Sequence, residues 1–411
     1  MTAPRTEPSA PTEDRGRLAK AMICEETTRV CAARCEPAPR AIVLTGSLAR
    51  DEATFIEEGT SWRLLGDADF FLVFHRRTRL PSQIEIDAAT REIEEALRKR
   101  GLVAEVGLAP VDTSYLEGLP NHISPYELRS CGQVVWGDGD ILSHVPEFAP
   151  AQISLEDAWR LLANRIIELV EVVASEGDVE RPQVQYRVVK LFLDMATSYL
   201  VFAGRYCPTY RGREQALRSM AGETAESSGS PFPLRSFAER VSTCTRFKTE
   251  GCGLTAAPVE LWEDAVRFGR LLWRWELARL TGAPSHLEAS ALMSRWMDLQ
   301  PMRAKVHGWA SLLRRSGSWR SWRDWSRWAR LAWRASPRYW VYAAAADVFS
   351  RSTDGSQNRH EQDEGDFDWK PLLERLPMVD RRFPGPCSPS WRRAAQLVAL
   401  NYRGFLETTV A

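Results

Sequence analysis

The chain has 411 residues, and 44% of them are apolar, which suffices for at least one hydrophobic core and, at the usual domain size, for two or three domains. Its 54 basic and 54 acidic residues cancel, so no global charge directs the protein to nucleic acid or to a membrane, and any such contact must be local. The eight cysteines lack the paired CxxC spacing of a zinc site, and neither a secretion signal nor a run of about eighteen apolar residues occurs. We therefore expect a cytoplasmic protein with reduced thiols.

The first part of the chain alternates helix-like and strand-like segments. Residues 1–14 are rich in Pro, Thr, Ser and Glu, which predicts a disordered tail. Apolar runs and helical spacing then predict, in order, a helix over 15–33, a strand over 41–46, a strand over 67–74, a helix over 82–101 and a strand over 102–111. Strands separated by helices predict an α+β fold, in which a small mixed sheet has flanking helices.

Helical patterns dominate after Pro150. This change predicts a first domain over 15–148 and a mostly helical domain over 149–350. A polar, charged stretch over 351–368 is expected to be a linker or loop, followed by a C-terminal helical segment over 369–411.

Two carboxylates stand out inside the strand over 67–74. Side chains alternate between the two faces of a strand, so Asp67 and Asp69 project from the same face. Two acids buried together repel each other unless a cation neutralises them, and Mg²⁺ prefers such oxygen ligands. Glu105, in the apolar run VAEVGL, completes a three-carboxylate cluster if its strand lies beside the first. Such a cluster suits two metal ions that clamp the attacking and leaving oxygens of an in-line phosphoryl or nucleotidyl displacement.

The segment GSLAR, at 46–50, follows the first strand and offers phosphate contacts. Gly46 lets the backbone approach a phosphate closely, and the Ser47 hydroxyl and the amides that open the next helix can donate to its oxygens. Arg50 could add a positive charge to a triphosphate. The segment therefore predicts a phosphate-binding turn.

The order GSLAR, GDADFFLVF and a later strand acid resembles the DNA polymerase beta superfamily of nucleotidyltransferases, in particular its minimal and antibiotic nucleotidyltransferase branches. The resemblance covers about residues 40–110. It implies a nucleotidyltransferase fold over 15–148, with a helical domain that closes over the nucleotide. By the same resemblance, Gly46 and Ser47 would hold the triphosphate, Asp67 and Asp69 would ligate metal, and Glu105 would ligate the metal that activates the acceptor hydroxyl.

The chain departs from the family pattern in two places. The stretch between the Gly-Ser pair and the first acid is longer, which implies an insertion near 54–65, and Asp51 stands where a glycine often follows the arginine. The third acid also has an alternative, Asp112. We favour Glu105, because Asp112 follows Pro110 and a loop is expected there.

Lys190 lies on a predicted helix of the second domain, on one stripe with Asp194. It would contact the triphosphate, as a lysine of the helical domain does in several relatives, or it would form an ordinary ion pair with Asp194 on a solvated face. The sequence leaves both interpretations open.

The stretch 314–338 carries eight arginines and five tryptophans. We favour a helix that packs partly against the domain with its arginines pointing outward. Contact with single-stranded nucleic acid or with a membrane interface is the alternative.

We expect a Mg²⁺-dependent enzyme that moves a nucleoside monophosphate, with AMP from ATP favoured, onto a hydroxyl of a small molecule or protein and releases pyrophosphate. A catalytically inactive module that binds a nucleotide or a partner is the first alternative. An RNA-directed nucleotidyltransferase is the second, and the balanced charge counts against it. The acceptor, the base preference and the oligomeric state stay open at this point.

Overall fold

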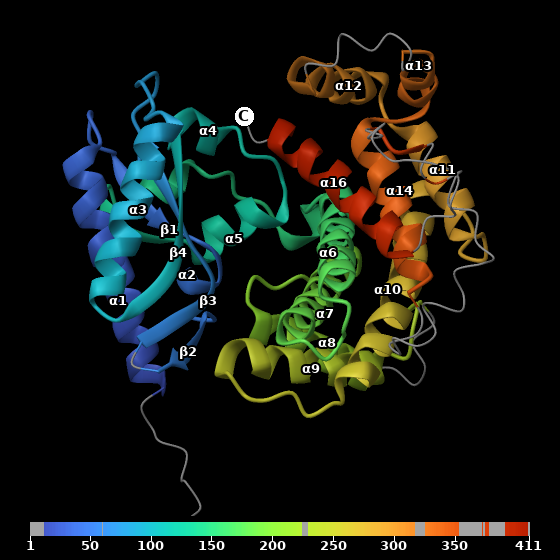
Figure 1. The fold of residues 1–411 in the computed structure, drawn as a ribbon, viewed down its shortest axis with the longest axis horizontal. Helices are drawn as coiled ribbons and strands as arrows, with labels where there is room; N and C mark the ends of the chain where they lie inside the picture. Colours follow the sequence, from blue (N-terminus) through green and yellow to red (C-terminus); the bar gives the residue numbers. More distant parts are fainter. Residues whose placement is uncertain are drawn as a thin grey trace, which may run out of the picture. The chain divides into compact units, whose positions relative to one another are not determined.

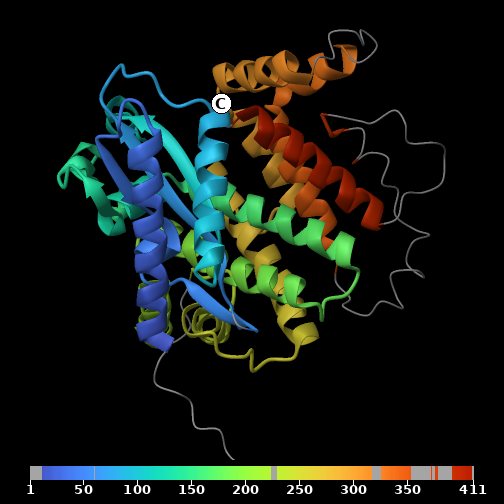
Figure 2. The same ribbon diagram turned by 60° about the vertical axis from the view of Figure 1, so that its left-hand side comes forward.

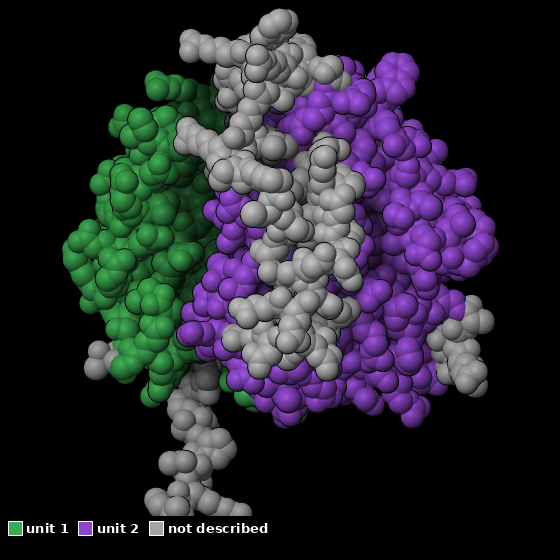
Figure 3. Space-filling model, turned by 45° about the vertical axis from the view of Figure 1, so that its right-hand side comes forward, with its two compact units in different colours: residues 1–154, 204–213, 245–253 green, residues 155–203, 214–244, 254–411 purple. Residues whose placement is uncertain are grey.

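The computed structural model describes residues 12–59, 61–223, 229–316, 325–352, 372, 375–377 and 391–409. The chain divides into two compact units, coloured separately in Figure 3. Unit 1 comprises Met1–Ser154, Gly204–Arg213 and Thr245–Gly253, and unit 2 comprises Leu155–Ala203, Glu214–Cys244 and Leu254–Ala411. The sequence placed a domain boundary at 148/149 and assigned 204–213 and 245–253 to the helical domain. Within the described ranges, no helix combines the length and the apolar character needed to span a bilayer.

Unit 1 is built on a five-stranded sheet (Figure 1). The strands are β1 (Ala41–Leu44), β2 (Thr54–Glu58), β3 (Ser61–Phe74), β4 (Leu102–Asp112) and β5 (Gln133–Gly137). The long strand β3 pairs antiparallel with β2 through its first part and with β1 through its second part, while β4 pairs parallel with β3 and β5 pairs antiparallel with β1. The protein is therefore a mixed α+β protein with a small mixed sheet, as predicted.

Helices α1 (Thr12–Arg34) and α3 (Gln83–Lys99) cover one face of this sheet and lie side by side in Figure 2. Helix α3 starts at a capping box, in which the Ser82 hydroxyl accepts from the Glu85 amide and the Glu85 carboxylate accepts from the Ser82 amide. Helix α1 begins at Thr12, so it overlaps the last residues of the tail predicted over 1–14, and residues 1–11 lie outside the described ranges.

The opposite face of the sheet is covered only in part. Buried side chains of β1, β3 and β4 pack there against α4 (Thr113–Glu117), α5 (Ile123–Cys131) and the short 3-10 helix η1 (Ile141–His144). Val73 is fully buried in this cluster and Phe71 packs against it, whereas Asp67 and Asp69, further back on the same strand, are exposed. This uncovered part of the face is where a ligand has access to the sheet.

Residues 54–65, where the resemblance implies an insertion, form a β-hairpin of β2 and the first part of β3. The β3–β4 register is irregular between Arg63 and Asp67, and Gly66 has a φ of 112°, which a side chain would disfavour. The irregularity therefore lies immediately before the acid-bearing segment.

Unit 2 is helical. Its helices are α6 (Leu155–Glu176), α7 (Pro182–Phe202), most of α8 (Tyr210–Glu223) and α9 (Leu234–Glu250), α10 (Pro258–Thr281), α11 (Ala289–Leu299), α12 (Met302–Ser316), α13 (Trp325–Arg334), α14 (Pro337–Ser350) and α16 (Trp391–Thr409). Buried aromatic rings hold the bundle together. Trp159 of α6 stacks on Tyr339 of α14 with ring centroids 5.7 Å apart and meets Tyr342 edge to face at 5.4 Å. Most of the linker predicted over 351–368 lies outside the described residues.

The Trp/Arg stretch 314–338 is described in part. Trp328 is buried, its indole donates to the Pro377 carbonyl oxygen at 3.0 Å, and the Arg327 guanidinium donates to the same oxygen at 3.1 Å. Trp333 is instead 74% exposed. The predicted packed helix therefore holds for Trp328 and not for Trp333, and residues 317–324 lie outside the described ranges.

Candidate functional site

Asp67 and Asp69 project from the same face of β3. Between and after them, Ala68 and Phe70 are buried in the core beneath α1 and α3, while both carboxylates are exposed. Strand alternation thus produces the arrangement that the sequence predicts.

Glu105 lies beside this pair on β4. The register places Glu105 opposite Asp67 and Gly107 opposite Asp69, so the three acidic residues occupy adjacent positions of one face. Next to Glu105, the Val106 amide donates a hydrogen bond to the Glu94 carboxylate of α3 at 3.1 Å, which links β4 to α3.

Asp112, the alternative third acid, has another role. It ends β4 and caps α4: its carboxylate accepts from the Ser114 hydroxyl at 2.6 Å and from the Tyr115 amide at 3.0 Å. These hydrogen bonds, that from Ser114 foremost, lower the pKa of Asp112. Its carboxylate thus serves a helix N-terminus, and Glu105 is the acid in register with the pair.

Two glycines make room for the Asp69 carboxylate. A Cβ atom at position 107 would lie 2.6 Å from Asp69 Oδ1, and one at position 46 would lie 3.5 Å from Asp69 Oδ2. The amide of Thr45 donates to the Asp69 carbonyl oxygen at 2.9 Å. Gly46, Asp69 and Gly107 are therefore neighbours at one point of the sheet.

Burial of the three acids, from which the sequence predicted a cation, is not observed. Asp67, Asp69 and Glu105 were expected to be buried in apolar strands, yet all three are exposed. Among the described residues, the cluster of α4, α5 and η1 on this face does not extend over them. Solvent can therefore stabilise their charges without an ion. What remains is a set of adjacent, accessible carboxylates.

The donor chemistry of this set fits Mg²⁺, a hard cation that binds through carboxylate oxygens and keeps several waters. The register supplies adjacent donors at Asp67 and Glu105, with Asp69 two residues further on. Among the residues that the structure describes, however, no group of three or more His, Cys, Asp or Glu side chains is close enough together to hold a metal ion. The backbone register therefore places the three acids at adjacent positions. Their side chains, as described, are not close enough together to hold a metal ion.

The Gly-Ser turn joins β1 to α2 (Gly46–Ala49), which is a single turn of helix. Gly46 has a φ of 73°, a left-handed conformation that favours glycine. With so short a helix, phosphate contacts would come from local amides and the half-buried Ser47 hydroxyl, the donors that the sequence suggested. Asp51 has a φ of 55°, and aspartate is among the residues that tolerate this conformation. Asp51 therefore adopts a backbone conformation that glycine also favours.

Arg50, which we predicted to contact the triphosphate, is engaged in a buried network inside unit 1. Its side chain is 5% exposed and pairs with Glu127 Oε2 at 2.6 Å and with Glu52 Oε2 at 3.4 Å. The Glu52 carboxylate also accepts from the amides of Tyr210 and Arg211 at 2.8 and 3.0 Å. Arg50 is thus a structural cation that anchors the end of the GSLAR segment, and we leave it out of the proposed triphosphate site.

Arg213 and Tyr206 complete this network. The fully buried Arg213 guanidinium pairs with Glu127 and donates to the Tyr206 hydroxyl oxygen at 2.7 Å, and Tyr206 donates to Glu127 Oε1 at 2.5 Å. Burial raises the pKa of Tyr206 well above its usual value, so the phenol stays protonated. We refer to Arg50, Glu52, Glu127, Tyr206 and Arg213 as the buried network.

Lys190 lies on α7 in unit 2, and its contact with a triphosphate stays a prediction. Asp194 pairs with Arg165 at 2.5 Å instead of with Lys190, whose ammonium lies 5.3 Å from the centroid of the Tyr186 ring. Burial lowers the pKa of Lys190, and Arg165 and Arg187 lower it further. The ordinary Lys190–Asp194 pair is therefore absent from the described contacts.

Sequence reasoning missed Gly107 and Lys248. An isolated glycine in a strand pattern is a signal of close approach and could have indicated Gly107. Lys248 is buried, and its ammonium donates to the Leu65 carbonyl oxygen at 3.0 Å, two residues before Asp67. Nothing local in the sequence marks this contact, which joins residues 183 positions apart.

Comparison with known proteins adds no relative. Neither the known protein families, nor the curated proteins, nor the solved structures contain a match to this chain.

Proposed function

We propose that unit 1 carries a Mg²⁺-dependent nucleotidyltransferase site and adopts the nucleotidyltransferase fold. One observation carries the proposal: the DxD pair of β3, Glu105 of β4 and the Gly-Ser turn after β1 meet on the uncovered part of one sheet face. These three elements are distant in sequence and are the parts that the resemblance to the DNA polymerase beta superfamily implies.

In the proposed reaction, Asp67, Asp69 and Glu105 would hold Mg²⁺, and Gly46 and Ser47 would contact the phosphates of the nucleotide. Bound Mg²⁺ would neutralise charge on the phosphates and lower the pKa of the acceptor hydroxyl. The acceptor oxygen bonds to the α-phosphorus, the bond from that phosphorus to the bridging oxygen breaks, and pyrophosphate leaves. The hydroxyl proton passes to a carboxylate of the site. The proposed donor is ATP, and the proposed acceptor is a hydroxyl of a small molecule or a protein.

The test is transfer of label from an α-labelled nucleoside triphosphate in the presence of Mg²⁺, with each of the four nucleotides and a panel of hydroxyl acceptors. Pyrophosphate release is followed in parallel. The double substitution Asp67→Asn with Asp69→Asn should lower turnover by about a thousandfold or more, since it removes two metal ligands.

The matched control carries Asp87→Asn with Asp140→Asn, which changes two other exposed aspartates of unit 1. This control should keep wild-type turnover. Equal turnover in the wild type and the Asp67/Asp69 variant would reject the proposal.

A second candidate is a module that binds a nucleotide and does not turn it over. The engagement of Arg50 with Glu52 and Glu127 favours it, because the arginine of the GSLAR segment is already paired within the protein. Saturable binding of Mg²⁺-ATP with no pyrophosphate release on any acceptor would identify this candidate.

A further inference from the structure

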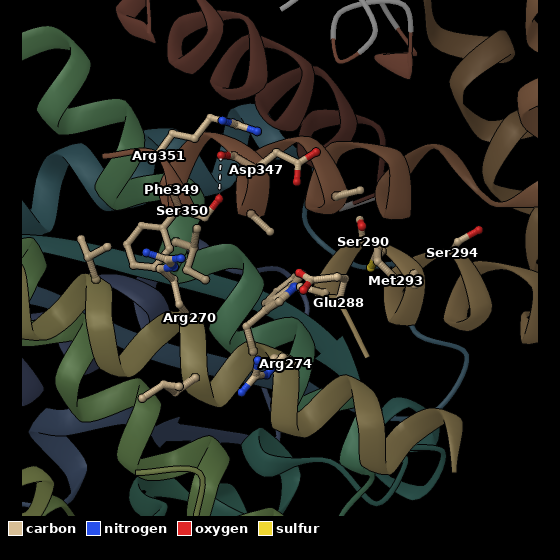
Figure 4. Close-up of a pocket in the computed structure, with 18 of the residues that line it drawn as sticks. Arg270, Arg274, Glu288, Ser290, Met293, Ser294, Asp347, Phe349, Ser350 and Arg351 are labelled. Carbon is tan, nitrogen blue, oxygen red and sulfur yellow. Dashed lines mark hydrogen bonds between the residues drawn. The ribbon is translucent and has the colours of Figure 1, made fainter. Parts of the chain in front are cut away.

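Unit 2 contains a cavity of about 810 Å³ that is separate from the carboxylates of unit 1. Figure 4 shows its walls: α10 with Arg270 and Arg274, the start of α11 with Ser290 and Met293, and the end of α14 with Asp347. Binding sites for small molecules usually measure about 300–1,000 Å³. The cavity therefore has the size of a ligand site.

The floor of the cavity is apolar and aromatic. It includes Trp273 and Met293, which are 4% exposed, and Phe349, which is 2% exposed. Gly269 of α10 shapes this floor, since a Cβ atom there would lie only 2.9 Å from the Phe349 ring. A glycine inside a helix destabilises the helix by about 1 kcal/mol relative to alanine, and here the glycine is what lets the ring approach.

The rim of the cavity is basic. It carries six arginines and three carboxylates, which are Arg267, Arg270, Arg274, Arg334, Arg351, Arg375, Glu263, Glu288 and Asp347. Some of these cations are already paired: Arg267 with Asp264 at 2.5 Å, and Arg334 with Asp298 at 3.6 Å. The excess of arginines over carboxylates makes the rim attractive to an anion.

Arg270 and Arg274 are the two cations of the rim on which the inference rests. They lie one turn apart on α10, both are exposed, and both line the cavity. Neither side chain forms an ion pair or a hydrogen bond with any residue in the described parts of the chain. Two like charges at this spacing repel each other on a helix, so an anion bound between them would relieve that repulsion.

We propose that this cavity binds a small organic anion, in which an aromatic body of one or two rings lies on the Trp273 and Phe349 floor and a carboxylate or phosphate meets Arg270 and Arg274. Guanidinium groups bind both head groups through paired hydrogen bonds. This site is independent of the proposed nucleotidyl transfer, and its test needs no enzymatic activity.

The experiment uses the full-length protein and 1-anilinonaphthalene-8-sulfonate, a fluorescent anion with an aromatic body. Its uncharged analogue, N-phenyl-1-naphthylamine, is titrated in parallel. We expect saturable binding of the anion, and at least tenfold weaker binding in the variant with Arg270→Gln and Arg274→Gln. Affinity for the uncharged analogue should stay the same in both proteins.

The matched control carries Arg295→Gln with Arg303→Gln, two exposed arginines of unit 2 that do not line the cavity. Circular dichroism and thermal unfolding establish that both variants fold. Displacement of the probe by 1-naphthyl phosphate or by 1-naphthoate supports the proposal, and the tighter competitor identifies the head group. Equal loss of affinity in the two variants, or displacement by neither competitor, overturns it.

Discussion

Unit 1 contains two groups of charged residues that differ in burial and in ion pairing. The buried network holds Arg50, Glu52, Glu127 and Arg213 away from water, and each of these charges meets an opposite charge. The carboxylate face, defined by Asp67, Asp69 and Glu105, is exposed, and no ion pair joins Asp67 or Glu105 to a described residue.

The charges of the buried network stabilise the fold, whereas the exposed carboxylates can bind a ligand. Charges in a buried, hydrogen-bonded set are satisfied within the protein, and breaking one of them leaves its partner buried and unpaired. Carboxylates that share an exposed face gain nothing from each other, and Asp67 and Glu105 can accept a cation without breaking an ion pair to a described residue. The comparison predicts large stability effects in the buried network and functional effects on the carboxylate face.

The largest effect is expected for Arg213→Met. The substitution leaves Glu127 facing one cation instead of two in a buried site, and it removes hydrogen bonds to Tyr206 and to the Cys207 carbonyl oxygen. We expect the free energy of unfolding to fall by about 3–5 kcal/mol. Urea unfolding followed by tryptophan fluorescence measures it.

Arg211→Met is the control for this prediction. Arg211 lies on the same helix and is exposed, and only its backbone amide contacts Glu52. The Arg211→Met substitution should change the free energy of unfolding by less than about 0.5 kcal/mol. Equal losses in the two variants would show that the buried network adds no stability of its own.

Glu276 sharpens the comparison, because it is a buried carboxyl without a cation. It is fully buried in unit 2, the Ser198 hydroxyl lies 2.5 Å from its Oε1, and its Oε2 has no hydrogen-bond partner among the described residues. Burial raises the pKa of Glu276 to about 8 from an ordinary value of 4.5. The folded protein therefore holds a proton that the unfolded chain releases between these pH values.

Because the folded state binds more protons in this window, stability should fall as the pH rises from 4.5 to about 8. We expect a decrease on the order of 3 kcal/mol that Glu276→Gln removes, since glutamine keeps the shape and carries no charge. Unfolding free energies of both proteins at several pH values provide the measurement. Parallel pH profiles of the two proteins would contradict the assignment.

The sequence predicted the carboxylate face well because its signals are local. Alternation along one strand places Asp67 and Asp69 on one face, and Gly46 directly follows an apolar strand. The partner strand of Glu105 was inferred from an apolar run, and the register agrees. Exposure of these acids could not be read from the sequence, because it depends on where α4, α5 and η1 end their coverage of the sheet.

The buried network could not be predicted for a different reason. Arg50 and Glu127 are 77 positions apart, and Glu127 and Arg213 are 86 positions apart. Each of these residues looks like an ordinary surface charge in its own helix or turn. The assignment of Arg50 to a phosphate was reasonable from its place after the Gly-Ser pair, and only the tertiary contacts show that its charge is already paired.

A smaller effect is expected at Gly107, which lies on β4 opposite Asp69. Gly107→Ala would bring a Cβ atom to 2.6 Å from Asp69 Oδ1, so the carboxylate must move. We expect kcat/KM of the proposed transfer to fall about tenfold, equivalent to about 1.4 kcal/mol. The control is Gly139→Ala, where a Cβ atom meets nothing within 4 Å. Equal kcat/KM in wild type and Gly107→Ala would show that the position of Asp69 does not limit the reaction.

The smallest effect on stability is expected for Asp67→Asn with Asp69→Asn. Both carboxylates are exposed, so their removal should change the free energy of unfolding by less than about 0.5 kcal/mol. We expect the change to be a small stabilisation, because like charges on one strand face repel each other. Addition of Mg²⁺ and ATP should raise the thermal unfolding temperature of the wild type and leave that of the variant unchanged, because a ligand stabilises only the protein that binds it. A loss of several kcal/mol without ligand would instead make the carboxylate face structural, and the contrast with the buried network would disappear.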